Sequence, residues 1–252
     1  MTKSIENKIC KTKICKKIIM SITQIIIFSI IIFLIISLVY LTYTQIIPFC
    51  ITTYNKVYNK FFTSPFVNYN NYSILKKYNN KEIALEMLST IDQNMIKLVY
   101  AFNAKYDNID KMDICNKQKK LLKTIKYKLN KTYKSNSLQE NFPSIVGKEV
   151  SYNVNKGEVI SICLRNYNNP DEFHDLNDLI FVTIHEIAHS CNESYGHDKK
   201  FWKIFRILLE VAVENNLYKN INYQKQKKSY CSMQITYNPI FDKSLDDISY
   251  FT

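Results

Sequence analysis

Two histidines four residues apart, His185 and His189, constrain this chain more than any other sequence feature. On a helix, residues at i and i+4 face the same way one turn apart, so both imidazoles can bind one tetrahedral metal ion. Glu186 directly follows the first histidine and can reach a water molecule on that metal. Zinc lowers the pKa of such a water toward ~7, and a carboxylate can take its proton during attack on a carbonyl. The segment therefore predicts a zinc site with its own base, as metal-assisted peptide hydrolysis requires.

The surrounding sequence favours a functional histidine cluster over a chance match. The chain contains only four histidines, and three of them, His185, His189 and His197, are close together. Upstream, Asp175 fits the N-cap of a helix, and residues 179–188 are mostly apolar, which predicts that this helix is buried. A degenerate or purely structural zinc site is the alternative interpretation.

The third metal ligand follows from an argument about distance. Gly196 can adopt a positive φ and return the chain toward the metal, which favours His197. Glu210 and Glu214 are the rivals, because a glutamate about twenty residues after the second histidine ligates zinc in thermolysin-like sites. A helix that begins near Asp198 would carry Glu210 about 18 Å along its axis, out of reach of a metal at His197. His197 is therefore the preferred third ligand.

These motifs resemble those of a known family. The HEIAH segment at 185–189, followed by GHDKKFW at 196–202, resembles the WLM and SprT-like zinc metallopeptidases, whose third histidine lies in a Gly-His-x-x-x-Phe segment that opens a helix. The layout is also similar to WLM-like metallopeptidases of large DNA viruses, where a membrane segment and a helical region precede this domain. The resemblance covers about residues 80–240. It implies zinc as cofactor and a protein or peptide as substrate.

The resemblance also implies an α+β fold. Residues 139–240 would form a zincin-like metallopeptidase domain with a small antiparallel sheet, the metal helix and a following helix. Within it, residues 149–165 predict a hairpin that turns at Asn155-Lys156-Gly157. By analogy with zincins, an edge strand here would bind the substrate in extended form. Arg165 is expected to be a surface charge, and His174 to serve the start of the metal helix rather than the zinc.

Two amphipathic helices are predicted within the helical region at 79–138. The first covers residues 81–106 and has a continuous apolar stripe. The second covers residues 117–134, which contain eight lysines and no acidic residue, with leucine and isoleucine at helical spacing. We expect the two to form an antiparallel pair packed on the metal domain. The lysine face is expected to be solvated, and the alternative is contact with an anionic lipid surface or nucleic acid.

An apolar segment near the N-terminus predicts membrane insertion. No charged residue occurs in residues 18–55, and residues 25–41 are almost entirely Ile, Phe, Leu and Val. About 20 such residues span the hydrocarbon core, so a transmembrane helix is predicted over residues 18–43. A buried core helix would be unusual in being apolar on every face, so long and attached to a charged arm, and the apolar region of a cleaved signal peptide is only about 7–15 residues long. An uncleaved, single-pass anchor is therefore preferred.

The flanking charges predict the orientation of this anchor. The basic N-terminal arm, residues 1–17, holds six lysines and one acidic residue, whereas only Lys56 and Lys60 follow the span closely. The positive-inside bias therefore places the N-terminus in the cytosol and the metal domain on the other side, in a lumen, outside the cell or across a viral membrane. Residues 44–78 are polar and tyrosine-rich and predict a linker. Residues 241–252 predict a tail.

The net charge of +12 is unevenly distributed along the chain. Residues 139–252 hold twelve basic and fifteen acidic residues, whereas residues 74–138 hold fourteen lysines and six acidic residues. The metal domain is thus slightly acidic. This balance disfavours a catalytic domain that itself grips nucleic acid by charge.

The seven cysteines show no C-x-x-C spacing. Cys191 and Cys231 are the expected disulfide pair, joining the segment after the metal helix to the C-terminal region. Cys191 also stays open as an alternative zinc ligand because it closely follows the second histidine. Tyr195, Tyr230 and Tyr237 are candidates for donating a hydrogen bond to the oxyanion of the reaction.

Together these features predict a membrane-anchored zinc-dependent endopeptidase. His185, His189 and His197 would hold the zinc, and Glu186 would be the general base. The protein would lie in a virion or in an internal membrane of the host. A non-catalytic membrane or virion scaffold with a structural zinc site is the alternative function. A lysine-rich tether between membrane and nucleic acid is a third.

Overall fold

The computed structural model divides the chain into two compact units, residues 1–64 and 65–252. The residues that it describes are 24, 26–47, 49–50, 53, 64–69, 71–135, 137–143 and 151–246. The basic arm at 1–17 and the end of the predicted tail, residues 247–252, therefore lie outside the described residues.

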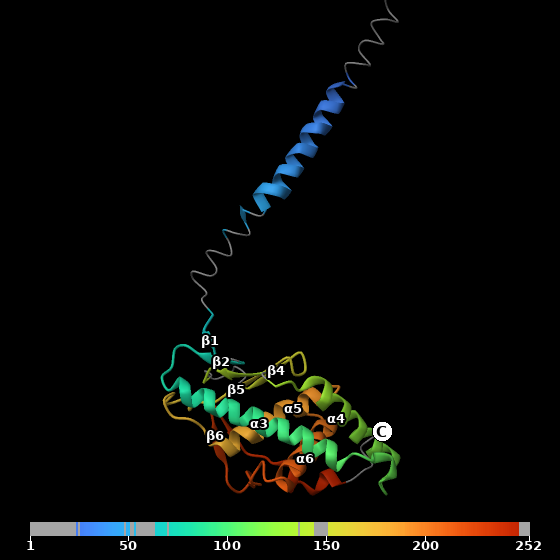
Figure 1. The fold of residues 1–252 in the computed structure, drawn as a ribbon, viewed down its shortest axis with the longest axis vertical. Coiled ribbons are helices and arrows are strands. Elements are labelled where there is room, and N and C mark those ends of the chain that lie inside the picture. Colours follow the sequence, from blue (N-terminus) through green and yellow to red (C-terminus); the bar gives the residue numbers. More distant parts are fainter. Residues whose placement is uncertain are drawn as a thin grey trace, which may run out of the picture. The chain divides into compact units, whose positions relative to one another are not determined.

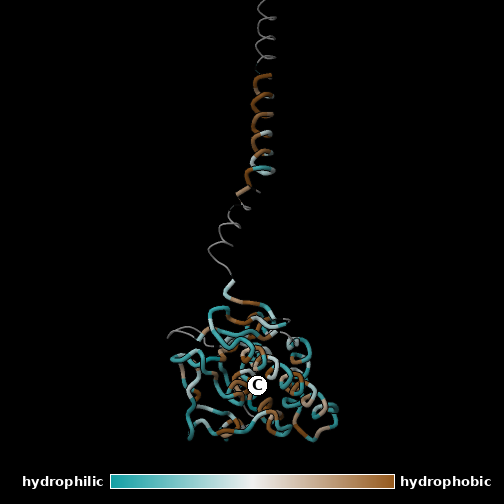
Figure 2. The backbone as a smooth tube through the Cα atoms, turned by 60° about the vertical axis from the view of Figure 1, so that its left-hand side comes forward, coloured by the Kyte–Doolittle hydropathy of each residue, from teal (hydrophilic) through white to brown (hydrophobic). Residues whose placement is uncertain are grey.

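The first unit contains one apolar helix, which runs from Ile26 to Ile46 (Figure 1). It has 21 residues and a mean hydropathy of 2.7, and none of its most apolar part is buried against the rest of the protein. Figure 2 shows the hydrophobic colouring of this segment. The last turn, η1 (Thr42–Ile46), is a π-helix. By length and composition the helix is able to cross a membrane. The predicted start of the span, residues 18–23, lies outside the described residues.

The second unit is built on a five-stranded sheet with the order β1-β2-β3-β5-β4. The strands are β1 (Phe66–Tyr69), β2 (Tyr72–Leu75), β3 (Leu138–Asn141), β4 (Tyr152–Val154) and β5 (Val159–Cys163). The β1-β2 and β4-β5 pairs are antiparallel, whereas β3 lies parallel to both β2 and β5. The α+β class is thus confirmed, but the sheet is mixed rather than antiparallel. The long helical connection between β2 and β3 explains this, because it lets the chain re-enter the sheet in the same direction.

Strands β1 and β2 lie in the segment that the sequence predicts to be a linker, residues 44–78. Ile74 and Leu75 of β2 are fully buried. The backbone N–H of Leu75 donates to the buried carboxylate of Glu140 on β3 (2.8 Å). The linker prediction therefore fails for the last part of this segment. Strands of four residues are too short to show an alternating pattern among so many polar residues.

The described residues of this unit also form four α-helices, and Figure 1 shows them gathered on one side of the sheet. They are α3 (Lys81–Lys105), α4 (Asn116–Thr132), α5 (Leu176–Cys191) and α6 (Lys199–Glu214). The two helices predicted in the helical region correspond to α3 and α4, which contact each other and are joined through the short η2 (Ile109–Lys111). Helix α5 is central, because it contacts the other three helices and strands β4 and β5.

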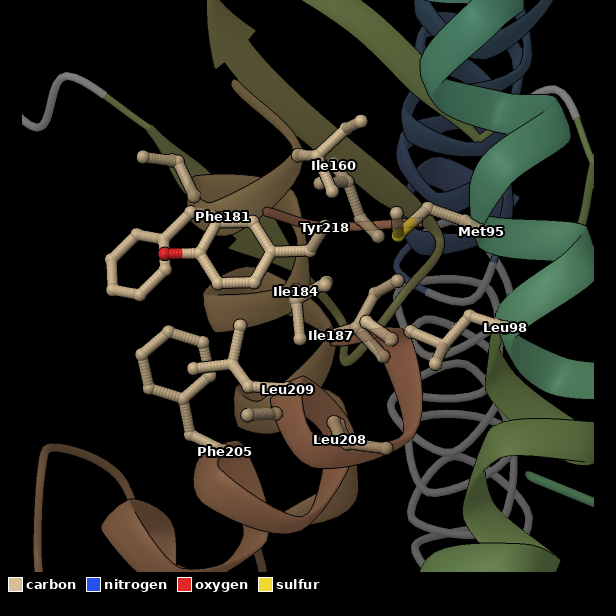
Figure 3. Close-up of a cluster of buried hydrophobic side chains, with 14 of the residues drawn as sticks. Met95, Leu98, Ile160, Phe181, Ile184, Ile187, Phe205, Leu208, Leu209 and Tyr218 are labelled. Carbon is tan, nitrogen blue, oxygen red and sulfur yellow. The ribbon is translucent and has the colours of Figure 1, made fainter. Parts of the chain in front are cut away.

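The hydrophobic core lies around α5 (Figure 3). Ile184 and Ile187 of α5 pack with Met95 of α3, Ile160 of β5 and Leu208 of α6, and all five are at most 1% exposed. Almost the whole circumference of α5 is buried, as expected for a helix that is apolar on most sides. The core therefore fixes the position of the helix that carries His185 and His189.

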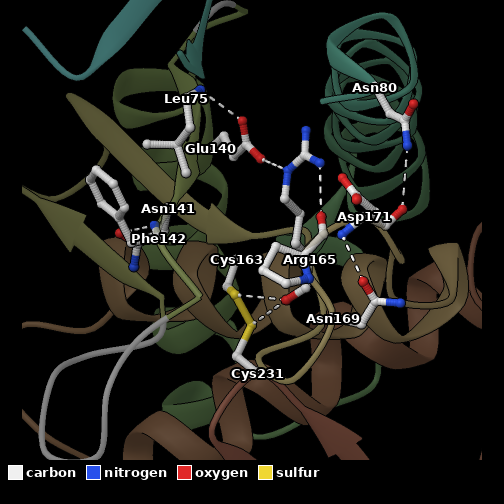
Figure 4. A network of polar contacts seen from close by, with 11 residues as sticks. Leu75, Asn80, Glu140, Asn141, Phe142, Cys163, Arg165, Asn169, Asp171 and Cys231 are labelled. Carbon is white, nitrogen blue, oxygen red and sulfur yellow. Dashed lines mark hydrogen bonds and ion pairs between the residues drawn. A yellow bond between two sulfur atoms is a disulfide. The ribbon is translucent and has the colours of Figure 1, made fainter. Parts of the chain in front are cut away.

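The C-terminal region adds a hairpin of β6 (Lys228–Tyr230) and β7 (Met233–Ile235), followed by the 3-10 turns η3 (Pro239–Phe241) and η4 (Lys243–Asp246). A disulfide between Cys163 and Cys231 joins this hairpin to the end of β5 (Figure 4). The expected Cys191–Cys231 pair is therefore wrong. Cys191 is fully buried at the end of α5 and is a free thiol.

Arg165 is fully buried, which corrects the expectation that it is a surface charge. Its Nε lies 2.5 Å from Oε1 of Glu140, whose side chain is also fully buried (Figure 4). One of its terminal nitrogens donates to the backbone carbonyl of Pro170 (2.9 Å), and the ring of Phe173 lies 4.5 Å below the guanidinium carbon. The pair links β3 to the segment after β5 inside the fold.

Candidate metal centre

The start of α5 places the metal motif on a firmly anchored helix. Asp175 is the N-cap, and its carboxylate accepts a hydrogen bond from the backbone N–H of Asn177 (2.8 Å), as the sequence predicts. Three turns later, His185 and His189 lie on the same face of the helix. Their Nε2 atoms are 3.2 Å apart.

His197 joins these two histidines although it belongs to the segment after α5. Its Nε2 lies 2.9 Å from that of His185 and 3.1 Å from that of His189. A neutral imidazole nitrogen is either a donor or an acceptor, so three mutually close Nε2 atoms cannot all pair with one another. Ligand nitrogens at ~2.0–2.1 Å from a tetrahedral zinc lie roughly 3.3 Å apart, close to the observed separations. The donor set therefore fits a zinc ion.

The loop between α5 and α6 brings His197 back toward α5. Gly196 has a φ of +92°, a conformation that L side chains rarely adopt. Asp198 is the N-cap of α6, and its carboxylate accepts hydrogen bonds from the backbone N–H of Phe201 (2.7 Å) and from the side chains of Asn192 and Ser194 (3.2 and 2.5 Å). The turn at Gly196 and the start of a helix near Asp198 agree with the sequence prediction.

Aromatic side chains of α6 support the three imidazoles. The ring of His189 stacks on Phe201, with centroids 4.3 Å apart, and that of His197 stacks on Trp202, with centroids 5.3 Å apart. Phe201 also meets His185 edge to face, at 4.9 Å. These contacts give the phenylalanine and tryptophan of the GHDKKFW segment a physical role, because they fix the ring orientations.

All three imidazoles have a pKa below the ordinary value of 6.5. Burial is the largest cause for each, and it lowers the pKa of His189 to about 4, with help from the charges of His197 and Lys156. The pKa of His185 is lowered by burial and by its two histidine neighbours, and that of His197 by burial alone. The rings are therefore neutral near pH 7, which is the form that binds metal ions.

Glu186 lies on α5 one residue after the first of these histidines, and only 6% of it is exposed. Its negative charge contributes to the raised pKa of Tyr230, for which burial is the largest cause. The Tyr230 hydroxyl is 2.6 Å from the Ser151 hydroxyl and accepts a hydrogen bond from the backbone N–H of Cys163 (3.2 Å). Of the three tyrosines considered from the sequence, Tyr230 is thus the one whose electrostatics are coupled to Glu186.

The other two tyrosines have different surroundings. Tyr195 is 92% exposed, and the ammonium group of Lys156 lies 5.2 Å from its ring centroid. The hydroxyl of Tyr237 donates to the carboxylate of Asp242 (2.6 Å), and its ring meets Trp202 edge to face.

The rival metal ligands do not join the histidine cluster. Glu210 forms an ion pair with Arg206 (2.7 Å), and Glu214 forms one with Lys105 (2.6 Å). The thiol of Cys191 is fully buried, and burial raises its pKa to about 12. Among the described residues, the potential ligand atoms near His185 and His189 come only from His197.

His174 lies apart from the three-histidine cluster, as the sequence predicts. Its Nε2 accepts a hydrogen bond from the backbone N–H of Cys231 (2.9 Å), and it packs against the ring of Tyr230. Its ligand atom falls within 4.8 Å of the two sulfurs of the Cys163–Cys231 disulfide. This histidine therefore joins the start of α5 to the β6-β7 hairpin.

Two residues near the centre were missed in the sequence. Asn153 on β4 donates hydrogen bonds to the backbone carbonyl of Glu186 and to the hydroxyl of Ser190 (2.7 and 2.5 Å). The ammonium group of Lys156, in the turn after β4, donates to the backbone carbonyls of Asn192 and Glu193 (2.7 and 2.9 Å). Both lie in the predicted hairpin, but its contact with α5 is a tertiary feature without a local sequence signal.

Comparison with curated proteins finds three relatives, all of them uncharacterized proteins of viruses. One from Acanthamoeba polyphaga mimivirus is 37% identical over 106 residues, which are 42% of this chain and 52% of the relative. One from Invertebrate iridescent virus 6 is 38% identical over 82 residues, which are 32% of this chain and 44% of the relative. The chain thus spans about half the length of the curated relatives that it matches.

Among solved structures, the chain is similar to Wss1. A crystal structure of Wss1 from Saccharomyces cerevisiae is 21% identical, with a TM-score of 0.34, and the match covers 57% of this chain and 90% of that chain. The model of the WLM domain matches residues 67–239, which is more than half of the chain and includes α5, the loop after it and α6. The chain therefore belongs to the WLM domain family.

Proposed function

We propose that this chain is a membrane-anchored, zinc-dependent endopeptidase. The observation that carries the proposal is the convergence of three imidazole nitrogens, from His185, His189 and His197. Glu186 lies on α5, next to the first of these histidines in the sequence. Membership in the WLM family, a zinc metallopeptidase family, supports both the metal and the reaction class.

His185, His189 and His197 would hold the zinc ion. When bound, the zinc lowers the pKa of a water molecule and polarises the carbonyl of the scissile peptide bond. Glu186 would take the proton from the attacking water and deliver it to the nitrogen of the leaving amine. Burial of Glu186 supports this role, because a low local dielectric strengthens its interaction with the proton that it transfers.

Strand β4 is proposed to bind the substrate. It is the last strand of the sheet order, so one of its edges has no partner among the described strands. It also packs against α5, and Asn153 connects it directly to the helix turn of Glu186. An extended peptide that pairs with this edge would run alongside the metal helix.

The apolar helix Ile26–Ile46 is proposed to anchor the enzyme in a membrane. The N-terminal arm would be cytosolic, because of its lysines, and the catalytic unit would lie on the other side. The Cys163–Cys231 disulfide supports this placement, since disulfides persist in oxidising compartments and are rare in the cytosol.

Metal content and proteolysis of one pair of variants test this function. The full chain, purified in a non-ionic detergent, is expected to bind one zinc ion and to cleave a denatured protein such as casein. Glu186→Gln should keep the zinc and lose the cleavage, whereas His197→Ala should lose both. Cleavage that persists in Glu186→Gln would contradict the mechanism. A zinc-loaded parent chain that cleaves no protein would instead indicate the structural-zinc scaffold.

A further inference from the structure

A basic groove of ≈600 Å³ runs along α4 and reaches the loop that precedes His197. Four lysines of α4 line it together with one aromatic ring and one carboxylate from that loop. These residues are Lys119, Lys120, Lys123, Lys128, Tyr127 and Glu193. The lysine face that the sequence predicts to be solvated therefore lines an open groove.

Only some of the lysines in this groove have a hydrogen-bond or ion-pair partner for their ammonium group. Lys123 pairs with the carboxylate of Asp110 (2.5 Å), and Lys119 donates to the backbone carbonyl of the same residue (2.8 Å). Within the described residues, the ammonium groups of Lys120 and Lys128 have neither a hydrogen bond nor an ion pair. Lys128 is half-buried, and its pKa is lowered, chiefly by burial and also by the charges of other lysines. The charge of Glu193 opposes this shift, but no ion pair joins it to Lys128, and such a partly desolvated cation is a favourable position for an anionic group.

The positive charge of the groove continues toward the histidine cluster. Lys128 is electrostatically coupled to Lys156 and Lys200, and Lys200 pairs with the groove carboxylate of Glu193 (3.0 Å). Lys156 donates to two backbone carbonyls of the loop after α5, which leads to His197. Positive charge thus extends from α4 to the metal centre.

We propose that this groove binds an acidic segment of the polypeptide that the metal centre cleaves. The proposal rests on the proposed endopeptidase function and specifies its substrate class. Lys120 and Lys128 would pair with carboxylates of the substrate, while a flanking part of the same polypeptide would enter the centre beside β4. Charge complementarity of this kind raises the rate of encounter and selects among substrates.

The groove itself indicates carboxylates rather than a phosphate backbone as its partners. One of its lysines, Lys123, already pairs with the carboxylate of Asp110, and a second carboxylate, that of Glu193, also lines the groove. These two acidic side chains would repel a continuous phosphate chain, whereas a polypeptide with spaced charges can place its carboxylates opposite Lys120 and Lys128 alone. The lining residues include no arginine, the side chain that recognises phosphate in a planar, bidentate manner.

Peptide binding by a catalytically silent chain tests this proposal. The probe is a fluorescein-labelled peptide of alternating Glu and Ser, and its control replaces each Glu by Gln. Fluorescence anisotropy is measured with the full-length, zinc-loaded Glu186→Gln chain in non-ionic detergent, so that binding is read without cleavage. We expect the acidic peptide to bind more tightly than its control, and increasing salt to weaken only the acidic peptide.

A charge-reversed chain locates the binding to the groove. Lys120→Glu with Lys128→Glu should weaken binding of the acidic peptide roughly tenfold, because each substitution replaces an attraction by a repulsion. The matched control, Lys97→Glu with Lys225→Glu, changes the net charge equally at exposed positions outside the groove and should have little effect. Equal losses in the two variants would overturn the proposal, because the attraction would then come from net charge alone.

Three further outcomes separate this proposal from its alternatives. If a single-stranded oligonucleotide binds more tightly than the acidic peptide and loses affinity in Lys120→Glu with Lys128→Glu, the groove serves nucleic acid and the proposal is overturned. If the acidic peptide binds in the groove but the parent chain, which retains Glu186, cleaves no protein, acidic peptide binding by the groove is supported and the endopeptidase function is refuted. If cleavage occurs and the acidic and neutral peptides bind equally, the function stands and the groove proposal fails.

Discussion

The side-chain amide of Asn153 donates a hydrogen bond to the backbone carbonyl of Glu186, at 2.7 Å. The same amide nitrogen lies 2.5 Å from the hydroxyl of Ser190, and the amide oxygen accepts from the backbone N–H of Gly157 (2.6 Å). One side chain therefore joins edge strand β4, the turn that follows it and the helix that carries the proposed base.

Replacement of Asn153 by alanine should loosen the edge strand without removing a metal ligand. We expect Asn153→Ala to lower the free energy of unfolding by about 1–3 kcal/mol, since it leaves buried partners of several hydrogen bonds unsatisfied. Zinc content should be unchanged, and the KM for a peptide substrate should rise. Urea denaturation, metal analysis and steady-state kinetics measure the three effects. Asn103→Ala, which removes a solvent-exposed pair with Asn130, is the control and should change stability little.

Gly196 is predicted to be required for its backbone conformation rather than for space. A Cβ added at this residue would meet nothing within 4 Å, yet its φ is +92°. Gly196→Ala should therefore cost about 1–2 kcal/mol of backbone strain and shift His197 away from the other imidazoles. The expected result is weaker zinc binding in competition with a chromophoric chelator. Gly196→Asn should recover part of the affinity, because asparagine tolerates positive φ better than alanine does. Equal affinities in the alanine variant and the parent would refute this role.

The Cys163–Cys231 disulfide closes a loop with a sequence separation of 68 residues and anchors the hairpin that carries Tyr230. Replacement of both cysteines by alanine should lower the free energy of unfolding by about 2–4 kcal/mol. A thiol reductant should lower the melting temperature of the parent but not that of the double variant. Cys115→Ser, at an exposed free cysteine, is the control. A parent chain that is insensitive to reductant would show that the bond does not form.

The histidine cluster could be predicted from the sequence because its determinants are local. The i, i+4 spacing of His185 and His189 sets their common face, and the positive φ available to Gly196 allows the return of His197. Helices α3 and α4 were likewise predictable from apolar positions at helical spacing. In each case, the residues that determine the structure are close together in the sequence.

The features that sequence analysis missed depend on contacts between distant segments. Arginine is usually a surface residue, and Arg165 is stable in the interior because it pairs with Glu140 and donates to the backbone carbonyl of Pro170. Cys163 pairs with Cys231 because the end of β5 lies beside the β6-β7 hairpin, a neighbourhood that no local pattern encodes. The parallel direction of β3 follows from the path of the helices that precede it.

His174 makes the stability of the fold depend on pH in a defined direction. Burial, the largest cause, holds its pKa below 6.5, although a hydrogen bond to the backbone of Arg165 and the charge of Asp178 raise it. Above pH 6.5 both the folded and the unfolded chain carry this imidazole neutral, so its hydrogen bond from the N–H of Cys231 contributes fully. As the pH falls from 6.5 through the lowered pKa, the unfolded chain binds a proton that the folded chain excludes, and this contribution is lost.

The variant His174→Asn isolates this effect from the metal ligands, which titrate in both proteins. At pH 7.5 it should be less stable than the parent by about 1–3 kcal/mol, because the buried N–H of Cys231 loses its acceptor. At pH 5 the difference between the two proteins should be smaller, since the parent alone has lost stability through His174. Urea denaturation at the two pH values measures both differences. A difference that stays constant would show that His174 does not titrate differently in the folded and unfolded states, and that its role is confined to the hydrogen bond.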